Sequence, residues 1–127
     1  MTKKYILIIS IIVLMFSFSG CEFVVGPGSA DYSYKLSGNY ELYHAGYTSI
    51  YKGDYEIVVT AEVKKIAWDD LYILARQEDD DKINYFIIDV NQDKVLGPLS
   101  EEDFNKKRDE LKIDKDLKLK DPSKYRK

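Results

Sequence analysis

The sequence is poor in the residues that carry most enzyme and metal chemistry. Its 127 residues contain one cysteine, Cys21, and one histidine, His44. A lone cysteine cannot form an intramolecular disulfide, so a hydrophobic core has to hold the fold alone. A single histidine also excludes a histidine-rich metal site. The longest apolar run, residues 5–18, has fourteen residues and is shorter than the roughly 20 that a membrane-spanning helix needs.

The same apolar run is well suited to an export signal. Lys3 and Lys4 precede it, and its length fits the apolar core of a secretory signal, which reaches about 15 residues. The small residues Ser19 and Gly20 follow the run and stand directly before Cys21. This order predicts a signal peptide that is removed from the mature protein.

The segment from Phe18 to Cys21 resembles the lipobox of bacterial lipoproteins, with Phe18 where that family usually has leucine. The resemblance implies that residues 1–20 are a lipoprotein signal peptide, that Cys21 carries a diacylglyceryl group, and that Cys21 becomes the new N-terminus. One acyl chain holds a protein only marginally on a membrane, whereas two hold it stably. We therefore expect a lipid anchor on the extracytoplasmic face of the cell membrane. The alternative is an ordinary signal peptide followed by an incidental cysteine.

Charge is distributed unevenly along the remaining chain. Residues 22–104 contain 7 basic and 17 acidic side chains, and residues 105–127 contain 10 basic and 5 acidic ones. An acidic body does not suit nucleic acid, so no nucleic-acid partner is expected. The basic C-terminal stretch is interpreted as a solvated face and tail, although it could also contact anionic lipid or cell-wall polymer.

The mature chain is long enough for one small domain. We expect residues 21–30 to be a flexible tether, because Gly26-Pro27-Gly28-Ser29 cannot continue regular structure. Residues 31–120 are expected to form the domain, and residues 121–127 a disordered tail. Short apolar or alternating segments separated by polar turns predict successive strands, of which residues 55–63 form a long one placed centrally in the sheet.

One helix is predicted near the C-terminus. Ser100 suits an N-cap, Leu99 and Phe104 suit a hydrophobic staple, and acidic residues follow Ser100 where the helix dipole is positive. The helix is expected from residue 101 to about residue 111. The fold class is therefore predicted as α+β, an antiparallel β-meander of about five to seven strands with one C-terminal helix packed on the sheet.

No catalytic, cofactor-binding or metal-ligating set emerges from the remaining residues. With Cys21 committed to lipid, Cys–His nucleophilic catalysis is excluded, and His44 has no motif around it. The run from Glu78 to Asp81 is predicted to be a solvated hairpin loop. Asp89, Asn91 and Asp93 have the opening spacing of a calcium loop, but Lys94 and Ser100 stand where that loop requires glycine and glutamate. A plain turn explains them better, and no metal or cofactor is expected.

The abundance of tyrosine is the most suggestive feature for binding. Seven of the 11 tyrosines lie between residues 31 and 60, namely Tyr32, Tyr34, Tyr40, Tyr43, Tyr47, Tyr51 and Tyr55. Exposed tyrosine rings can stack on sugars or line a protein interface. Tyrosines at a period of two can equally fill the core of a small sheet. The sequence leaves both interpretations open.

Three segments, residues 68–76, 85–89 and 97–104, resemble a pattern in small Gram-positive lipoproteins of unknown function: a strand, a strand ending in aspartate, then Gly-Pro-Leu and a helix opened by serine or threonine. The resemblance covers roughly residues 38–113. It implies location and fold and carries no catalytic residues.

The expected function is non-enzymatic: a membrane-anchored domain that binds or shields a protein or glycan partner at the cell surface. The alternatives are an immunity-type or inhibitor lipoprotein that engages a toxin or protease, a small envelope hydrolase that uses carboxylates, and a purely structural component of the envelope.

Overall fold

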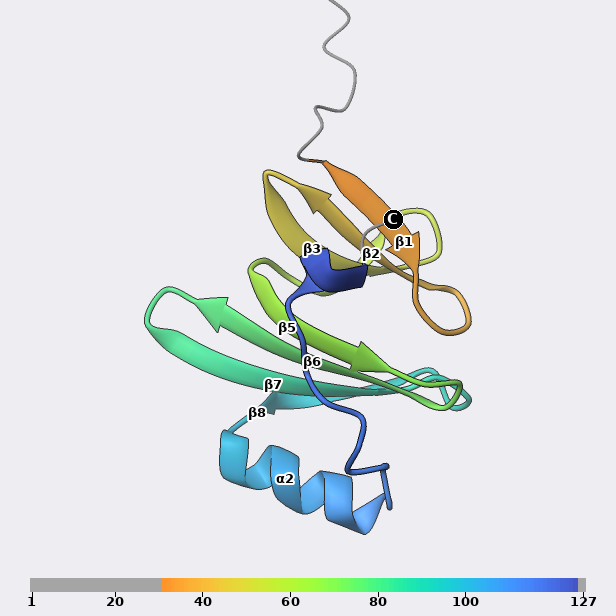
Figure 1. Cartoon of the computed structure of the whole chain (residues 1–127), viewed down its shortest axis with the longest axis vertical. Helices are drawn as coiled ribbons and strands as arrows, with labels where there is room; N and C mark the ends of the chain where they lie inside the picture. Colours follow the sequence, from red (N-terminus) through yellow and green to blue (C-terminus); the bar gives the residue numbers. More distant parts are fainter. Residues whose placement is uncertain (1–30, 126–127) are drawn as a thin grey trace, which may run out of the picture.

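Two antiparallel sheets, each of four strands, make up most of the protein in the computed structural model, which describes residues 31–125 (Figure 1). The N-terminal sheet has the order β1-β2-β3-β4 and contains β1 (Tyr32–Lys35), β2 (Tyr40–Ala45), β3 (Tyr47–Lys52) and β4 (Glu56–Val59). The C-terminal sheet has the order β5-β6-β7-β8 and contains β5 (Val63–Trp68), β6 (Tyr72–Asp79), β7 (Lys82–Asp89) and β8 (Lys94–Leu99). Helix α2 (Glu101–Glu110) and a short 3-10 helix, η1 (Pro122–Tyr125), follow.

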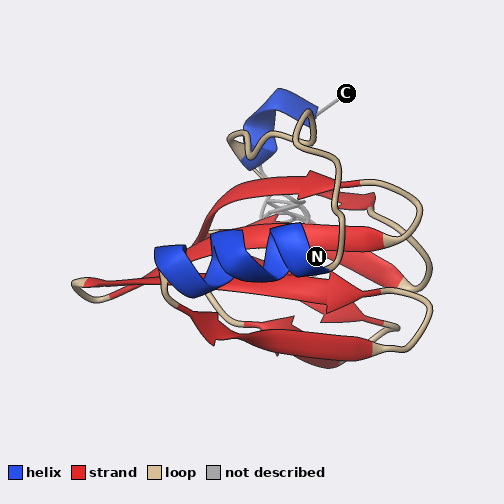
Figure 2. Cartoon of the chain, turned by 90° about the horizontal axis from the view of Figure 1, so that it is seen from below, coloured by secondary structure: helices blue, strands red, loops and turns tan. Residues whose placement is uncertain are grey.

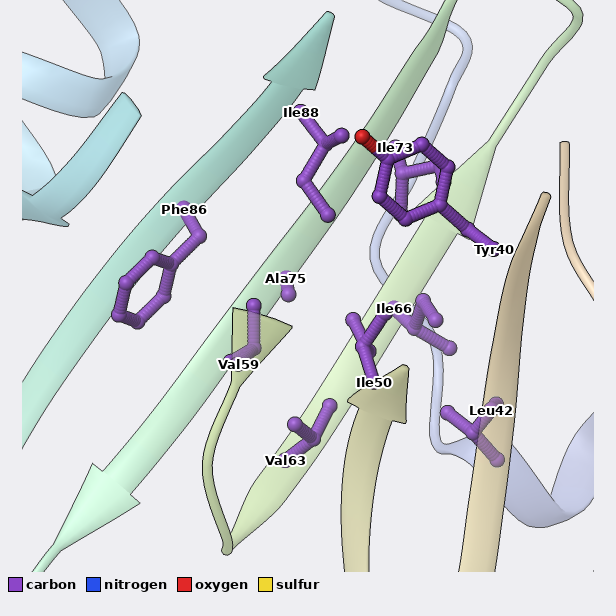
Figure 3. Packing of buried hydrophobic residues seen from close by; sticks show 10 residues of the cluster. All are labelled: Tyr40, Leu42, Ile50, Val59, Val63, Ile66, Ile73, Ala75, Phe86 and Ile88. Carbon is purple, nitrogen blue, oxygen red and sulfur yellow. The ribbon is translucent and has the colours of Figure 1, made fainter. Parts of the chain in front are cut away.

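The two sheets share one hydrophobic core, because alternate residues of each strand point toward the other sheet. Tyr40 and Leu42 of β2 belong to the same buried cluster as Ile73 and Ala75 of β6 (Figure 3). The other buried members of this core are Ile50, Val59, Val63, Ile66, Phe86 and Ile88. The predicted α+β class is therefore broadly consistent with the structure, but the expected single meander of five to seven strands is two meanders with eight strands in all.

A second core lies on the opposite face of the C-terminal sheet. Leu74 and Ile87 point away from the first core and are covered by Phe104 of helix α2 and by Ile113 beyond it. Figure 2 shows the helix lying along this face of the sheet. The three layers are thus the N-terminal sheet, the C-terminal sheet, and the helix with the segment that follows it (Figure 1).

The helix begins where the sequence predicts. The Ser100 Oγ accepts a hydrogen bond of 3.1 Å from the backbone N–H of Asp103, which satisfies one of the unpaired donors of the first turn. Phe104 is the one buried residue of the helix, and its ring stacks on Tyr85 with centroids 4.7 Å apart. A narrow apolar stripe therefore docks an otherwise exposed helix.

The single long strand predicted for residues 55–63 is wrong. The chain forms β4 up to Val59 and begins β5 at Val63, so the corner between the two sheets lies inside this segment. β4 is an edge strand, and the side chain of Ile57 is 49% exposed, contrary to the expected central position. Val59 and Val63 both enter the core between the sheets, which allows a continuous β-branched run to supply two separate strands.

The tail expected to be disordered from residue 121 is folded over residues 121–125. Lys120 and Ile66 of β5 exchange backbone hydrogen bonds of 2.8 and 2.9 Å, and this pairing holds the C-terminal segment along the edge of the C-terminal sheet. Pro122 is buried, and its carbonyl accepts a hydrogen bond of 2.6 Å from the Tyr34 hydroxyl. Tyr125 packs on Trp68, with ring centroids 4.5 Å apart. The polar composition of residues 121–127 gave no indication of these long-range contacts.

Three tyrosines with raised pKa values, one buried and two partly buried, are expected to make the folded state less stable at alkaline pH. The Tyr40 hydroxyl donates to the Asp93 carboxylate at 3.2 Å, and burial together with this carboxylate raises the pKa of Tyr40 from 10.0 to about 12. Burial also raises the pKa of Tyr34 and of Tyr125. The unfolded chain therefore loses these protons first, and the native state binds more protons than the unfolded state above about pH 10.

We expect the free energy of unfolding to fall by about 1.4 kcal/mol per pH unit for each such tyrosine as pH rises from about 10 toward the folded pKa. Urea denaturation between about pH 9 and about pH 11 measures this slope. Tyr40→Phe should show a shallower slope than the wild type, with Tyr34 and Tyr125 supplying the remainder. Identical slopes for the two proteins would contradict the assignment to Tyr40.

Candidate functional site

The outward side of the N-terminal sheet is the sheet face that neither core uses. The side chains of Tyr43, Tyr47, Tyr51 and Ile57 lie on it, and we call this set the outer tyrosine face. They point away from the first core because they alternate with the inward residues of β2, β3 and β4. Tyr47 is 65% exposed, and Tyr43 is 48% exposed. In the part of the chain that the structure describes, neither core includes any of the four.

Strand register arranges the centre of this face as a row across four strands. Lys35 pairs with Glu41, Glu41 with Tyr51, and Tyr51 with Ile57. Directly paired residues project from the same side of a sheet, so one row contains an ammonium, a carboxylate, an aromatic ring and an aliphatic side chain. Tyr43 lies in the neighbouring row, and its ring packs edge-to-face with the Tyr51 ring, with centroids 5.5 Å apart.

Two adjoining shallow pockets lie at the end of this face, where the β1–β2 and β3–β4 turns meet. One has a volume of about 200 Å³ and is lined by Glu41, Tyr43, Tyr51, Gly53 and Asp54. The other has a volume of about 180 Å³ and is lined by Lys35, Gly38, Asn39, Glu41, Gly53 and Asp54. They share three residues, and we call the pair the tyrosine groove. Each is smaller than the roughly 300 Å³ at which pockets begin to enclose drug-sized ligands.

Glycine turns hold the groove in shape. Gly53 has φ +64°, and its N–H donates to the Asn39 carbonyl at 2.8 Å, which ties the two turns together. Gly38 has φ +61°, and a Cβ placed there would lie 2.7 Å from the Val90 Cγ1. The β1–β2 turn therefore needs glycine both for its backbone conformation and for its close approach to the C-terminal sheet.

The structure divides the tyrosine cluster between both interpretations that the sequence leaves open. Tyr40 is buried in the core between the sheets, and Tyr32 and Tyr34 pack against that core. Tyr43 and Tyr47 are exposed on the outer face, and Tyr55 at the β3–β4 turn is 92% exposed. Alternation along β2 separates Tyr40 from Tyr43, but only the packing of the sheets determines which side is covered.

His44 lies in a different, polar pocket of about 350 Å³ at the side of the molecule. Its ring stacks on Tyr32 at 4.7 Å, and its Nδ1 is 2.7 Å from the Thr48 Oγ1. Ser123 also lines this pocket, but its hydroxyl donates to Asp121 at 2.7 Å. Among residues 31–125 the histidine therefore makes structural contacts, and no serine–histidine hydrogen bond of the kind used by hydrolases is formed.

Both carboxylates of the residues that have the opening spacing of a calcium loop make contacts within the protein. Asp89 accepts a hydrogen bond from the Gln92 N–H within a turn, and Asp93 accepts from Tyr40 and lies 3.6 Å from the Lys52 ammonium. The hairpin loop predicted for Glu78 to Asp81 is shorter than expected, because β6 extends to Asp79 and β7 begins at Lys82. Within residues 31–125, no group of three or more histidine, cysteine, aspartate or glutamate side chains is arranged to hold a metal ion.

The comparison with protein families gives one match. Residues 37–123 match the family model described as "Protein of unknown function (DUF3997)". The chain belongs to this family. The match covers strands β2 to β8, helix α2 and the residues that line the tyrosine groove except Lys35, while strand β1 precedes it. No curated protein and no solved structure matches the chain.

The predicted lipid-attachment residue, Cys21, lies outside the described residues, as do the whole predicted signal peptide and the whole predicted tether. Over the part of the chain that is described, no helix is long and apolar enough to cross a membrane.

Proposed function

We propose that this DUF3997 protein is an extracytoplasmic lipoprotein, anchored through Cys21, that binds a partner at the cell surface through its outer tyrosine face. The observation that carries the proposal is the uncovered side of the N-terminal sheet. The other three sheet faces contribute to the two cores, whereas this face presents tyrosine rings to solvent. Tyrosine is enriched in binding surfaces because a ring with few rotatable bonds combines apolar area with a hydroxyl group.

The position of the face in the chain is compatible with an anchored binding domain. Nine residues lie between Cys21 and Asp31, the first residue described, so ten peptide units connect the two. A chain of this length spans at most about 35 Å. The binding domain would therefore stay close to the bilayer, within reach of envelope proteins and glycans. An immunity-type or inhibitor lipoprotein is one form of the same proposal, with a toxin or protease as the partner.

One observation favours the alternative of a carboxylate-dependent envelope hydrolase. Glu41 and Asp54 line the same pocket of the tyrosine groove, and glycosidases use pairs of carboxylates. A general acid in such an enzyme needs apolar surroundings that keep its carboxyl group protonated near neutral pH. Asp54 is exposed at a turn, so the binding proposal has the better support.

Affinity capture from envelope extract tests the proposal. We expect the full chain in mild detergent to retain a partner, and the double variant Tyr43→Ser/Tyr47→Ser to lose it, because truncating central aromatic anchors removes most of the affinity of an interface. Ile83→Ser is the matched control, since Ile83 is 48% exposed but belongs to the C-terminal sheet. Equal retention by the double variant and the control, with all proteins folded, would contradict a role for the outer tyrosine face.

A further inference from the structure

We propose that the tyrosine groove is a subsite for an uncharged glycan whose pyranose rings stack on Tyr43 and Tyr51. The inference rests on the proposed function and identifies the class of partner that the outer tyrosine face would bind. Four features carry it: the paired rings, the polar groups beside them, the mixture of charges, and the shallow, open form of the groove.

The two rings form the apolar wall of the groove. Tyr43 and Tyr51 belong to neighbouring strands, and their planes are inclined at 63°, so they present two differently oriented surfaces to one ligand. The face of an aromatic ring carries partial negative charge. The C–H bonds along one side of a pyranose ring carry partial positive charge and can pack on such a face, while the hydroxyl groups remain free at the edge of the sugar.

Polar side chains line the groove beside the two rings, where they can form hydrogen bonds with the hydroxyl groups of a sugar. Lys35 and Asn39 supply hydrogen-bond donors, while Glu41 and Asp54 supply acceptors along the same groove. A sugar hydroxyl both donates and accepts, so a polyol can use all of these groups. A cationic peptide would be attracted by the two carboxylates and repelled by the Lys35 ammonium.

The charges of the groove also favour an uncharged ligand. The two carboxylates repel an acidic glycan, and the ammonium of Lys35 weakens attraction for a cationic one. Lys52 of β3 points to the opposite side of the sheet, where its ammonium lies 3.6 Å from the Asp93 carboxylate. It therefore adds no positive charge to the groove. Recognition would therefore depend on stacking and hydrogen bonds and would change little with ionic strength.

The form of the groove suits a chain of sugars better than a single enclosed molecule. Its two pockets adjoin through Glu41, Gly53 and Asp54 and extend from Asn39 at one turn to Tyr43 on the sheet. Neither pocket is large enough to bury a cofactor-sized ligand, which occupies roughly 300 Å³ or more. An oligosaccharide could instead lie along both pockets with part of its surface in water.

Isothermal titration calorimetry of the full chain in mild detergent with a β-1,4-linked N-acetylglucosamine tetrasaccharide tests this inference. We expect binding by the wild type, and affinity about tenfold lower for Tyr43→Ala because one stacking surface is lost. Asp54→Asn, an exposed turn substitution that keeps the shape of the side chain, should lower affinity about fivefold. Ile83→Ala is the matched control, because Ile83 is 48% exposed, as Tyr43 is, but belongs to the C-terminal sheet and does not line the groove.

Titration with tetralysine tests the competing class of ligand. Tetrasaccharide binding that is unchanged between about 50 and about 500 mM salt supports the glycan subsite. Absence of tetrasaccharide binding, equal losses in Tyr43→Ala and Ile83→Ala, or tetralysine binding that is tighter and weakens with salt would overturn it. If the outer tyrosine face still captures an envelope protein in any of these cases, the proposed function stands and only the glycan subsite fails. Release of new reducing ends from the tetrasaccharide would instead overturn the non-catalytic proposal.

Discussion

Replacing Phe104 with alanine is expected to lower the free energy of unfolding by about 3–5 kcal/mol. Phe104 is the one buried residue of helix α2, and its ring stacks on Tyr85 at 4.7 Å. Truncation removes this contact and leaves a cavity between helix α2 and the C-terminal sheet. Small domains are stable by only about 5–15 kcal/mol, so this one substitution would remove a large share of the total.

The measurement is urea denaturation followed by circular dichroism. Lys106→Ala is the matched control, because Lys106 is an exposed residue of the same helix and its substitution should change stability by no more than about 0.5 kcal/mol. Equal stabilities for the two variants would show that the helix does not depend on Phe104 for its attachment to the sheet. The melting curve of Phe104→Ala should also shift to lower temperature, since the second core loses its central aromatic ring.

Replacing Cys21 with serine is expected to abolish lipid attachment completely. Serine has no thiol for a thioether, and each buried CH₂ of an acyl chain contributes about 0.8 kcal/mol to membrane binding. Metabolic labelling with a fatty acid should therefore mark the wild type and leave the Cys21→Ser variant unlabelled. Ser29→Ala, in the predicted tether, is the control that should keep the label.

Fractionation needs a second variant, because an uncleaved signal peptide could itself hold the chain on the membrane. In a variant that carries Cys21→Ser and whose residues 1–20 are replaced by an ordinary cleavable secretory signal, the processed protein should be found in the soluble fraction, whereas the wild type should be found in the membrane fraction. Retention of that processed, unlabelled protein on membranes would contradict the lipid anchor.

Local features of the fold were predictable from the sequence because they depend on residues close together in the chain. Ser100 caps its helix through Asp103, three residues away, and the structure confirms the position of the helix start. Successive strands were also predicted from alternating segments, and β2 shows this alternation, with Tyr40 and Leu42 buried and Glu41 between them on the other side, because period-two patterning is a property of one strand. Each of these predictions needed only a short segment and elementary stereochemistry.

Features that depend on distant contacts were not predictable in this way. The folded C-terminal segment rests on Tyr34 and Pro122, which are 88 residues apart in the chain. The division into two sheets depends on Val59 and Val63, which enter the same core from different sheets although they lie in one β-branched run. No local pattern distinguishes such a corner from a continuous strand.

The candidate site shows the same division. The tyrosines between residues 31 and 60 were visible in the sequence, but the tyrosine groove was not, because it joins the β1–β2 turn to the β3–β4 turn through Asn39 and Gly53. Nothing near Asp54 in the sequence placed it beside Glu41 and Tyr43.

The sequence by itself determined the strand periodicity, the capped helix and the scarcity of thiol and imidazole groups. It also gave rise to the expectation of an export signal directly before Cys21. Each of these depends on composition or on neighbouring residues. Tertiary structure alone decided which tyrosines are buried. Tyr40 and Tyr43 have the same side chain and lie in the same strand, yet one faces the C-terminal sheet and the other faces solvent. The physical reason is that a strand has two sides, and only the packing of another layer determines which of them is removed from water.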